Sequence, residues 1–176
     1  MRLVSGFVLV VALALGGVAC GSDGGGSVNS NAALQGLMQT IALDFAQVLA
    51  DVAPSFDTLS AKGGGGNTAQ CPEGGNATWD GGSLGLSACQ MRGIAVSGNL
   101  TGFLDSYGDS VSALMMRGLI TASGGFSGEV NITDLTVSAQ LPIADATTFW
   151  QITATDSDGE MLCAWSGGSG CGPSDF

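Results

Sequence analysis

The sequence predicts a mostly β domain of the α+β class, in which one N-terminal amphipathic helix packs on a curved antiparallel sheet. Three observations support this prediction. Residues 34–52 carry apolar side chains at helical spacing, whereas the chain from residue 67 onward alternates between apolar and polar residues. Glycine-rich turn signals separate the alternating runs. A helix and a sheet each bury one apolar face, so the two form layers around a common core.

The predicted helix lies between capping residues and a proline. Asn29, Ser30 and Asn31 can cap its start, and Pro54 marks its end. Its apolar residues recur at alternating steps of four and three, which places them on one face: Leu34, Met38, Ile41, Phe45, Val48 and Val52. Three leucines widen this face: Leu37, Leu43 and Leu49. We expect the sheet of the same domain to cover it; a second chain or a membrane surface is the alternative.

A glycine run at residues 63–66 follows the helix and is preceded by Lys62. We interpret it as a linker, because a phosphate-binding loop would need Gly-Lys-Ser/Thr at the end of the run.

The remaining residues predict an antiparallel meander. We expect the alternate apolar residues of each run to face the helix: Leu84, Leu86, Ala88, Ile94, Val96, Leu100, Val111, Ala113, Met115, Val130, Ile132, Leu135, Val137, Trp150, Ile152 and Ala154.

The last run has two possible phases, since either Leu162 with Ala164 or Met161 with Trp165 can face inward. Turns are expected at seven places: Gly74-Gly75, Asp80-Gly81-Gly82, Gly98-Asn99, Tyr107-Gly108-Asp109, Ser123-Gly124-Gly125, Leu141-Pro142 and Asp158-Gly159. Gly118 and Gly128 fall within runs, where a glycine is typical of a bend or bulge in a strongly curved sheet.

The first residues are typical of a secretory signal peptide. One arginine precedes an apolar run from Phe7 to Leu15, and small residues lead to Ala19. Cys20 follows and opens a Gly/Ser-rich segment that we expect to be a flexible tether as far as residue 30. This arrangement resembles the precursor of a bacterial lipoprotein. The resemblance implies cleavage before Cys20, a diacylglyceryl thioether on its sulfur, and attachment to a membrane outside the cytoplasm.

The leader departs from the lipoprotein pattern at one position. Gly17 stands where a large aliphatic residue is usual, and Gly17-Val18-Ala19 also satisfies the small-x-small rule of ordinary signal peptidase. The alternative is therefore a secreted protein without lipid. Gly21 replaces the Asp that retains lipoproteins at the inner membrane, so we expect the outer membrane. The expected organisation is a signal peptide at 1–19, a lipidated cysteine and tether at 20–30, and one domain at 31–176.

The number of cysteines agrees with this interpretation. Five cysteines leave one unpaired in an exported protein, and lipid on Cys20 would account for it. The other four can form two disulfides in an oxidising compartment: Cys71, Cys89, Cys163 and Cys171. Of the three possible pairings we favour Cys71 with Cys89 and Cys163 with Cys171, which closes two short loops. A zinc site is the alternative, but the chain has no CxxC spacing and no histidine.

Composition argues against several functions. Beyond the leader, Lys62, Arg92 and Arg117 stand against 15 acidic residues, and such a surface repels nucleic acid. Without histidine there is no Ser-His or Cys-His nucleophile, so we expect no enzyme, cofactor or metal. A hydrolase would have to use carboxylates, and six are candidates: Asp80, Asp105, Asp109, Glu129, Asp134 and Asp145. Most lie in predicted turns, where Asp is common for backbone reasons.

Two further motifs have both a functional and a structural interpretation. Asp156-Ser-Asp158-Gly159-Glu160 resembles part of a calcium loop, but no ligands follow it at EF-hand spacing, and a hairpin turn explains it better. Trp150 and Trp165 flank this hairpin. They could stack across it or line a sugar- or lipid-binding surface, although core packing is the more frequent role of tryptophans such as these and Trp79.

The expected function is a non-catalytic, membrane-anchored lipoprotein that acts as an extracytoplasmic binding or structural module for an unknown partner. The first alternative is a carrier or sensor of an apolar ligand, since a helix across a concave sheet resembles in shape the periplasmic lipoprotein carriers and related lipid-binding half-barrels. It requires a cavity of about 300 Å³ between helix and sheet. The second alternative, a carboxylate-dependent hydrolase, requires two carboxyl groups roughly 5 to 10 Å apart in a cleft.

Overall fold

The computed structural model describes residues 26–53, 66–107, 109–143 and 148–171. The predicted signal peptide, Cys20, Lys62 with most of its glycine run, and Asp145 lie outside these residues. The described elements are one helix and ten strands: β1 (Gly26–Ser27), α1 (Asn31–Val52), β2 (Asn67–Gln70), β3 (Asn76–Asp80), β4 (Ser83–Met91), β5 (Ile94–Tyr107), β6 (Ser110–Gly124), β7 (Phe126–Gln140), β8 (Phe149–Thr155), β9 (Met161–Trp165) and β10 (Gly168–Ser169).

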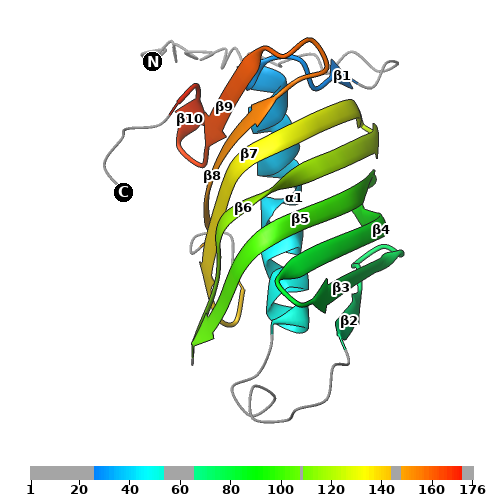
Figure 1. Cartoon of the computed structure of the whole chain (residues 1–176), viewed down its shortest axis with the longest axis vertical. Coiled ribbons are helices and arrows are strands. Elements are labelled where there is room, and N and C mark those ends of the chain that lie inside the picture. Colours follow the sequence, from blue (N-terminus) through cyan, green and yellow to red (C-terminus); the bar gives the residue numbers. More distant parts are fainter. Residues whose placement is uncertain (1–25, 54–65, 108, 144–147, 172–176) are drawn as a thin grey trace, which may run out of the picture.

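The sheet is an antiparallel meander that curves around α1 (Figure 1). From β2 to β10, strands that follow one another in the sequence are neighbours in the sheet, as the turn signals predicted. β1 is added in parallel to the start of β7, with Gly26 opposite Phe126, and Val28 beside it is buried. Residues 26–28, which the sequence analysis assigned to the tether, are therefore part of the described fold.

Helix α1 has the predicted bounds. Ser30 caps it, because its hydroxyl accepts a hydrogen bond from the N–H of Ala33 at 3.2 Å, and the helix ends two residues before Pro54. The side chain of Asn31 accepts a hydrogen bond from the N–H of Cys163 at 2.8 Å, which fixes the start of the helix to β9. The helix crosses the sheet on its concave side, and the sheet covers its apolar face as predicted (Figure 1). No described helix has the length and hydropathy needed to span a membrane.

Asn67 of β2 caps the other end of the helix. Its side-chain N–H group donates to the carbonyls of Val52 and Ala53 at 3.1 and 3.4 Å. We expect Asn67→Ala to cost about 1 kcal/mol of unfolding free energy through the lost hydrogen bond. Asn67→Asp should cost about 2 kcal/mol, because a carboxylate cannot donate and repels the negative end of the helix dipole. Urea unfolding measures both losses. Below about pH 4 the protonated carboxyl regains an O–H donor, so the loss caused by Asn67→Asp should fall to that of Asn67→Ala or below it. Equal losses at neutral pH would contradict the cap.

The inward alternation is confirmed along most strands, but two predicted positions are wrong. Ala88 and Met115 are exposed, and Cys89 and Met116 are buried in their place. Each pair lies at a register shift, and Ala88 and Met115 have φ values of +45° and +53°. A β-bulge adds one residue to a strand and so reverses the phase of everything after it. For β9 the sequence allowed two phases, and the structure shows the first: Leu162 and Ala164 face inward, and Met161 is exposed.

The turn predicted at Gly98-Asn99 is also wrong, because β5 continues through it. Gly98 and Gly118 have φ values of +143° and +148°, which favour glycine. A Cβ on Gly118 would overlap the carbonyl oxygen of Asn99, and one on Gly98 would overlap that of Leu119. These glycines therefore let β5 and β6 approach each other closely at the bend, and they explain how the sheet curves around the helix.

Candidate functional site

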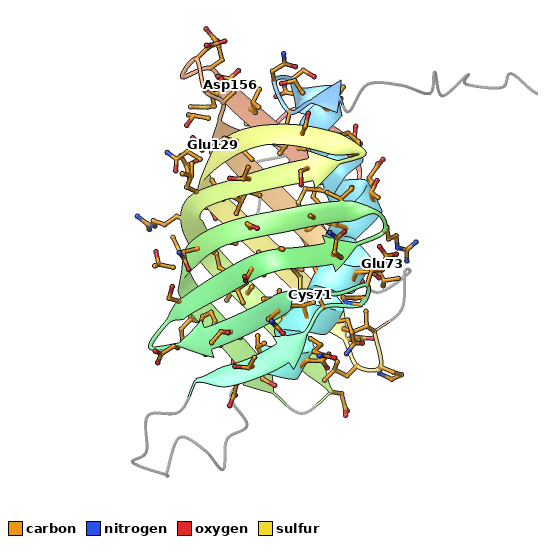
Figure 2. The ribbon with its side chains drawn as sticks, turned by 90° about the vertical axis from the view of Figure 1, so that its right-hand side faces the viewer. Cys71, Glu73, Glu129 and Asp156 are labelled. Atoms are coloured by element: carbon orange, nitrogen blue, oxygen red, sulfur yellow. A yellow bond between two sulfur atoms is a disulfide. The ribbon has the colours of Figure 1, made fainter. Side chains whose placement is uncertain are left out.

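The four cysteines of the domain form the favoured pairs. Cys71 is bonded to Cys89 and Cys163 to Cys171, with Cα separations of 5.3 and 4.7 Å. The first disulfide holds the loop after β2 against β4. The same loop is fixed to the β4–β5 turn, because the carboxylate of Glu73 accepts a hydrogen bond from the N–H of Gly93 at 2.7 Å. Figure 2 shows Cys71 and Glu73 at this end of the sheet. The zinc alternative is wrong for these cysteines, since their sulfurs are bonded to one another.

The candidate catalytic carboxylates are exposed and come from different parts of the sheet. Five lie among the described residues: Asp80, Asp105, Asp109, Glu129 and Asp134. Figure 2 shows Glu129 on the outer surface, at the same end of the sheet as Asp156 and away from Glu73. Among the described residues, no buried side chain is polar or charged. None of these five carboxylates therefore lies in the apolar cleft in which a glycosidase places its general acid.

Asp156 has a structural role in the β8–β9 hairpin. Its Oδ1 atom accepts hydrogen bonds from the N–H groups of Asp158 and Glu160, both at 2.9 Å. The carbonyl of Asp156 accepts a further bond from Gly159 at 3.1 Å. The predicted hairpin is confirmed, and this carboxylate orders the turn. Within the described ranges, no three His, Cys, Asp or Glu residues gather to hold a metal ion.

Two of the three tryptophans belong to the core. Trp79 and Trp150 are buried, at 9% and 3% exposure. Trp165 is directly opposite Gln151, so it lies on the face of the sheet away from Trp150. Its ring is close to Gly167, where a Cβ would overlap it. The two tryptophans therefore do not stack across the hairpin.

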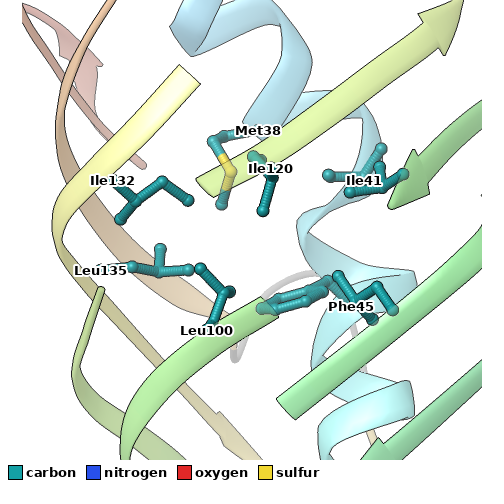
Figure 3. Close-up of a pocket in the computed structure, with 9 residues that line it drawn as sticks. Met38, Ile41, Phe45, Leu100, Ile120, Ile132 and Leu135 are labelled. Carbon is teal, nitrogen blue, oxygen red and sulfur yellow. The ribbon is translucent and has the colours of Figure 1, made fainter. Parts of the chain in front are cut away.

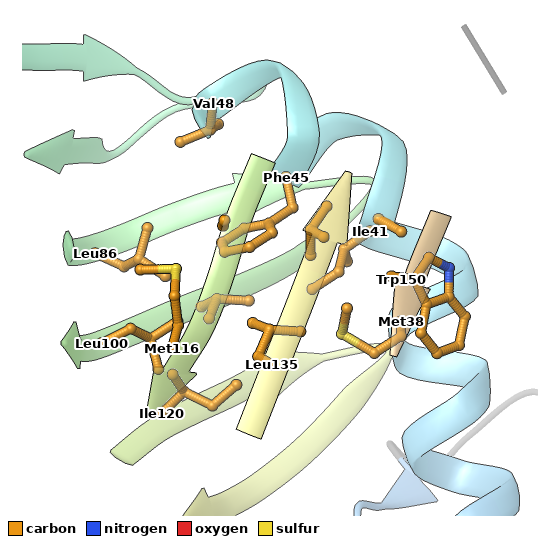
Figure 4. Packing of buried hydrophobic residues seen from close by; sticks show 14 of the residues in the cluster. Met38, Ile41, Phe45, Val48, Leu86, Leu100, Met116, Ile120, Leu135 and Trp150 are labelled. Atoms are coloured by element: carbon orange, nitrogen blue, oxygen red, sulfur yellow. The ribbon is translucent and has the colours of Figure 1, made fainter. Parts of the chain in front are cut away.

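The interface between helix and sheet contains one small gap (Figure 3). Nine apolar residues line it: Met38, Ile41, Phe45, Leu86, Val96, Leu100, Ile120, Ile132 and Leu135. Its volume is about 20 Å³, which is close to the space of one water molecule. Figure 4 shows side chains of α1 interleaved with those of the strands around it. Among the described residues, the helix fills the concave face, and the gap that they line is far smaller than a ligand.

This gap predicts opposite effects for two matched substitutions. Val96 lines the gap and Val130 does not, and both are buried side chains in neighbouring parts of the core. Val96→Ile should stabilise the fold by up to about 0.8 kcal/mol, because the added methylene fills empty space. Val130→Ile should destabilise it by about 1 kcal/mol or more, because it overpacks a filled site. Thermal or urea unfolding measures the change in unfolding free energy for both variants. If the two changes have the same sign, the gap has no room for an added methylene group.

The outer face carries an apolar cluster that the sequence did not predict. Phe103, Leu114 and Met115 are exposed by 60%, 38% and 63%. Phe103 is directly opposite Leu114, and the bulge in β6 turns Met115 outward beside them. We call these three residues the outer apolar cluster. The available signal was the run Leu114-Met115-Met116, since a strand cannot bury three consecutive side chains on one face.

Comparisons of the chain with models of protein families, with curated proteins and with solved structures found no match. Function is therefore inferred from the residues of this chain and their contacts. Among the described residues, the outer apolar cluster is exposed and could bind another molecule directly, whereas the apolar interface beneath α1 could do so only if the helix moved.

Proposed function

We propose that the protein is a non-catalytic lipoprotein, held at a membrane outside the cytoplasm by a lipid on Cys20, that acts as a binding module. The observation that carries this proposal is the complete pairing of the four later cysteines. Of the five cysteines, four are paired, and the remaining one is Cys20, which follows the predicted signal peptide directly. Because paired cysteines of an exported protein are inert, Cys20 remains for modification.

Metabolic labelling with an alkyne fatty acid tests the anchor. The wild-type chain should incorporate the label, and Cys20→Ala should not. A Cys71→Ala/Cys89→Ala double variant is the matched control, because it removes two other cysteines and should keep the label. Label on Cys20→Ala would disprove the assignment, and absence of label from every form would favour the secreted alternative. Gly21→Asp should move the lipoprotein from the outer to the inner membrane where the Asp sorting rule operates.

Binding rather than catalysis is supported by the distribution of reactive groups. The chain has no histidine, and the described candidate carboxylates are exposed and dispersed. The outer apolar cluster, in contrast, offers three large side chains to a partner at one place on the sheet. Exposed apolar side chains that gather in this way are typical of interaction sites.

A second candidate function is the transport or sensing of an apolar ligand. The cavity that a carrier requires is absent between the described helix and sheet, so this function would need α1 to move away from the nine apolar residues around the gap. Displacement of α1 would expose a trough suited to an acyl chain. Among the described residues, polar contacts between the helix and the sheet lie at the two ends of the helix and at the ion pair between Asp44 and Arg92, whose N–O distance is 3.4 Å.

Titration with cis-parinaric acid tests this second candidate. One saturable site per chain, displaced by oleic acid, would support a carrier. Arg92→Ala removes the ion pair to the helix and should tighten binding if α1 has to move. Absence of saturable fluorescence up to the solubility limit of the probe would reject the carrier and leave the binding module in place.

A further inference from the structure

Within the described part of the chain, the edge of β5 that faces β4 is open over the second half of the strand. β4 pairs with β5 only as far as Ser83 opposite Thr101, whereas β5 continues to Tyr107. The N–H of Gly102 donates to the carbonyl of Gly82 at 3.0 Å, so the backbone groups of residue 102 point to the β4 side. Backbone groups alternate in direction along a strand, and those of Leu104 and Ser106 therefore point to the same side. No described strand pairs with them there.

The outer apolar cluster lies beside this open edge. Phe103 points outward, because its neighbour Leu104 is buried at 7% exposure on the concave face. Met115 is turned outward by a left-handed backbone conformation with φ of +53°. For a residue other than glycine, this conformation costs on the order of 1 kcal/mol. The fold thus contains local strain at the place where it presents the most exposed apolar side chain of the cluster.

The charges around the open edge are mainly negative. Asp105 follows Phe103 on the same face, and Asp80 and Asp109 lie in or next to the turns at the two ends of the open stretch. Among the described cations, Arg117 is the nearest to the open stretch along the paired strands, since it lies opposite Thr101 on β6. The whole chain has a net charge of −11, so a second copy would be repelled. Charge complementarity instead favours a basic partner.

We propose that residues 103–107 of β5 accept an extended segment of another polypeptide as an additional strand. The backbone groups of Leu104 and Ser106 would pair with the segment. The outer apolar cluster would take a large apolar side chain opposite Phe103, and Asp105 would take a Lys or Arg. Strand addition of this kind obtains affinity from main-chain hydrogen bonds and specificity from alternate side chains. The inference rests on the proposed role as a binding module, but it does not depend on the lipid.

The probe is the acetylated and amidated peptide Thr-Thr-Lys-Val-Phe, which ends opposite Phe103, before the residues of β5 that already contact β4 and the turn before it. In antiparallel register its lysine meets Asp105, its valine meets Leu104 and its phenylalanine meets Phe103. Titration is followed by NMR on the full chain carrying Cys20→Ala, so the result is independent of the anchor. We expect a Kd on the order of 0.1 mM and about tenfold weaker binding when the lysine is replaced by glutamate.

Methylation of single peptide nitrogens distinguishes strand addition from simple apolar contact. The valine amide would point at β5 and the lysine amide away from it. N-methylation of the valine should abolish binding, whereas N-methylation of the lysine should leave the Kd unchanged. Equal effects of the two modifications would overturn the proposed pairing.

Protein variants test the specificity. Asp105→Lys should reverse the preference, so that the glutamate peptide binds about tenfold more tightly than the lysine peptide. Asp134→Lys is the control, because it reverses an exposed charge on β7 and should leave both affinities unchanged. Ser106→Pro removes one edge donor and should abolish binding while the NMR spectrum stays folded.

Three outcomes would overturn the proposal. They are equal affinity for the lysine and glutamate peptides, dimerisation in sedimentation experiments that Phe103→Ser abolishes, and binding to phosphatidylcholine vesicles that Phe103→Ser abolishes. The last two would assign the surface to a second copy or to a lipid surface. Absence of fatty-acid label on the wild type would contradict only the anchor.

Discussion

Gly118→Ala is expected to lower the free energy of unfolding by more than about 4 kcal/mol, a loss beyond that of most single substitutions. Two causes add up. Gly118 has a φ of +148°, a conformation that costs other residues about 1–3 kcal/mol. A Cβ there would also overlap the carbonyl oxygen of Asn99 and come within 3.2 Å of the Cα of Leu100. Because both neighbours belong to the backbone, β5 and β6 must separate at the bend to make room.

Gly74→Ala is the matched control for this prediction. Gly74 has a similar φ of +125°, but a Cβ on it would meet nothing within 4 Å. Gly74→Ala should therefore lower the free energy of unfolding only by the cost of the backbone conformation, about 1–3 kcal/mol. Urea unfolding of both variants separates strain from overlap. If the two losses are equal, the close approach of β5 and β6 does not depend on a missing side chain.

The order and type of the helix and the strands could be predicted from the sequence, because they depend on the spacing of apolar residues along the chain. The spacing of Leu34 to Val52 defined the helix, and turn signals defined most strands. The errors at Ala88, Gly98 and Met115 have a common cause. Bulges and glycine kinks arise from the curvature of the whole sheet, and curvature depends on contacts between strands that local sequence does not contain.

The candidate sites were predictable to different degrees. The pairing of Cys71 with Cys89 followed from cysteine number and loop length, and it is confirmed. The open edge of β5 could not be predicted, because it depends on where β4 ends relative to β5. The exposure of Phe103 depends on the same relation, since a longer β4 would lie beside it.

Removal of the Cys71–Cys89 disulfide is the second change with a large expected effect. The bridge closes a loop with a sequence separation of 18, and loop entropy alone predicts a loss of about 3 kcal/mol. Both cysteines are buried, so Cys71→Ala/Cys89→Ala also leaves unfilled space in the core. The bridge is close to β2, whose Asn67 caps α1. We therefore expect a total loss of about 3–5 kcal/mol.

The Cys163→Ala/Cys171→Ala variant is the internal comparison. Its bridge has a sequence separation of 8, which predicts about 2.5 kcal/mol, and Cys171 is exposed. Opening it releases β10, which pairs through only two residues, whereas opening Cys71–Cys89 loosens the β2–β3 edge that covers the end of the helix. In urea unfolding the first double variant should lose more stability than the second. A larger loss at the C-terminal bridge would mean that β10, rather than the β2 edge, limits unfolding of the sheet.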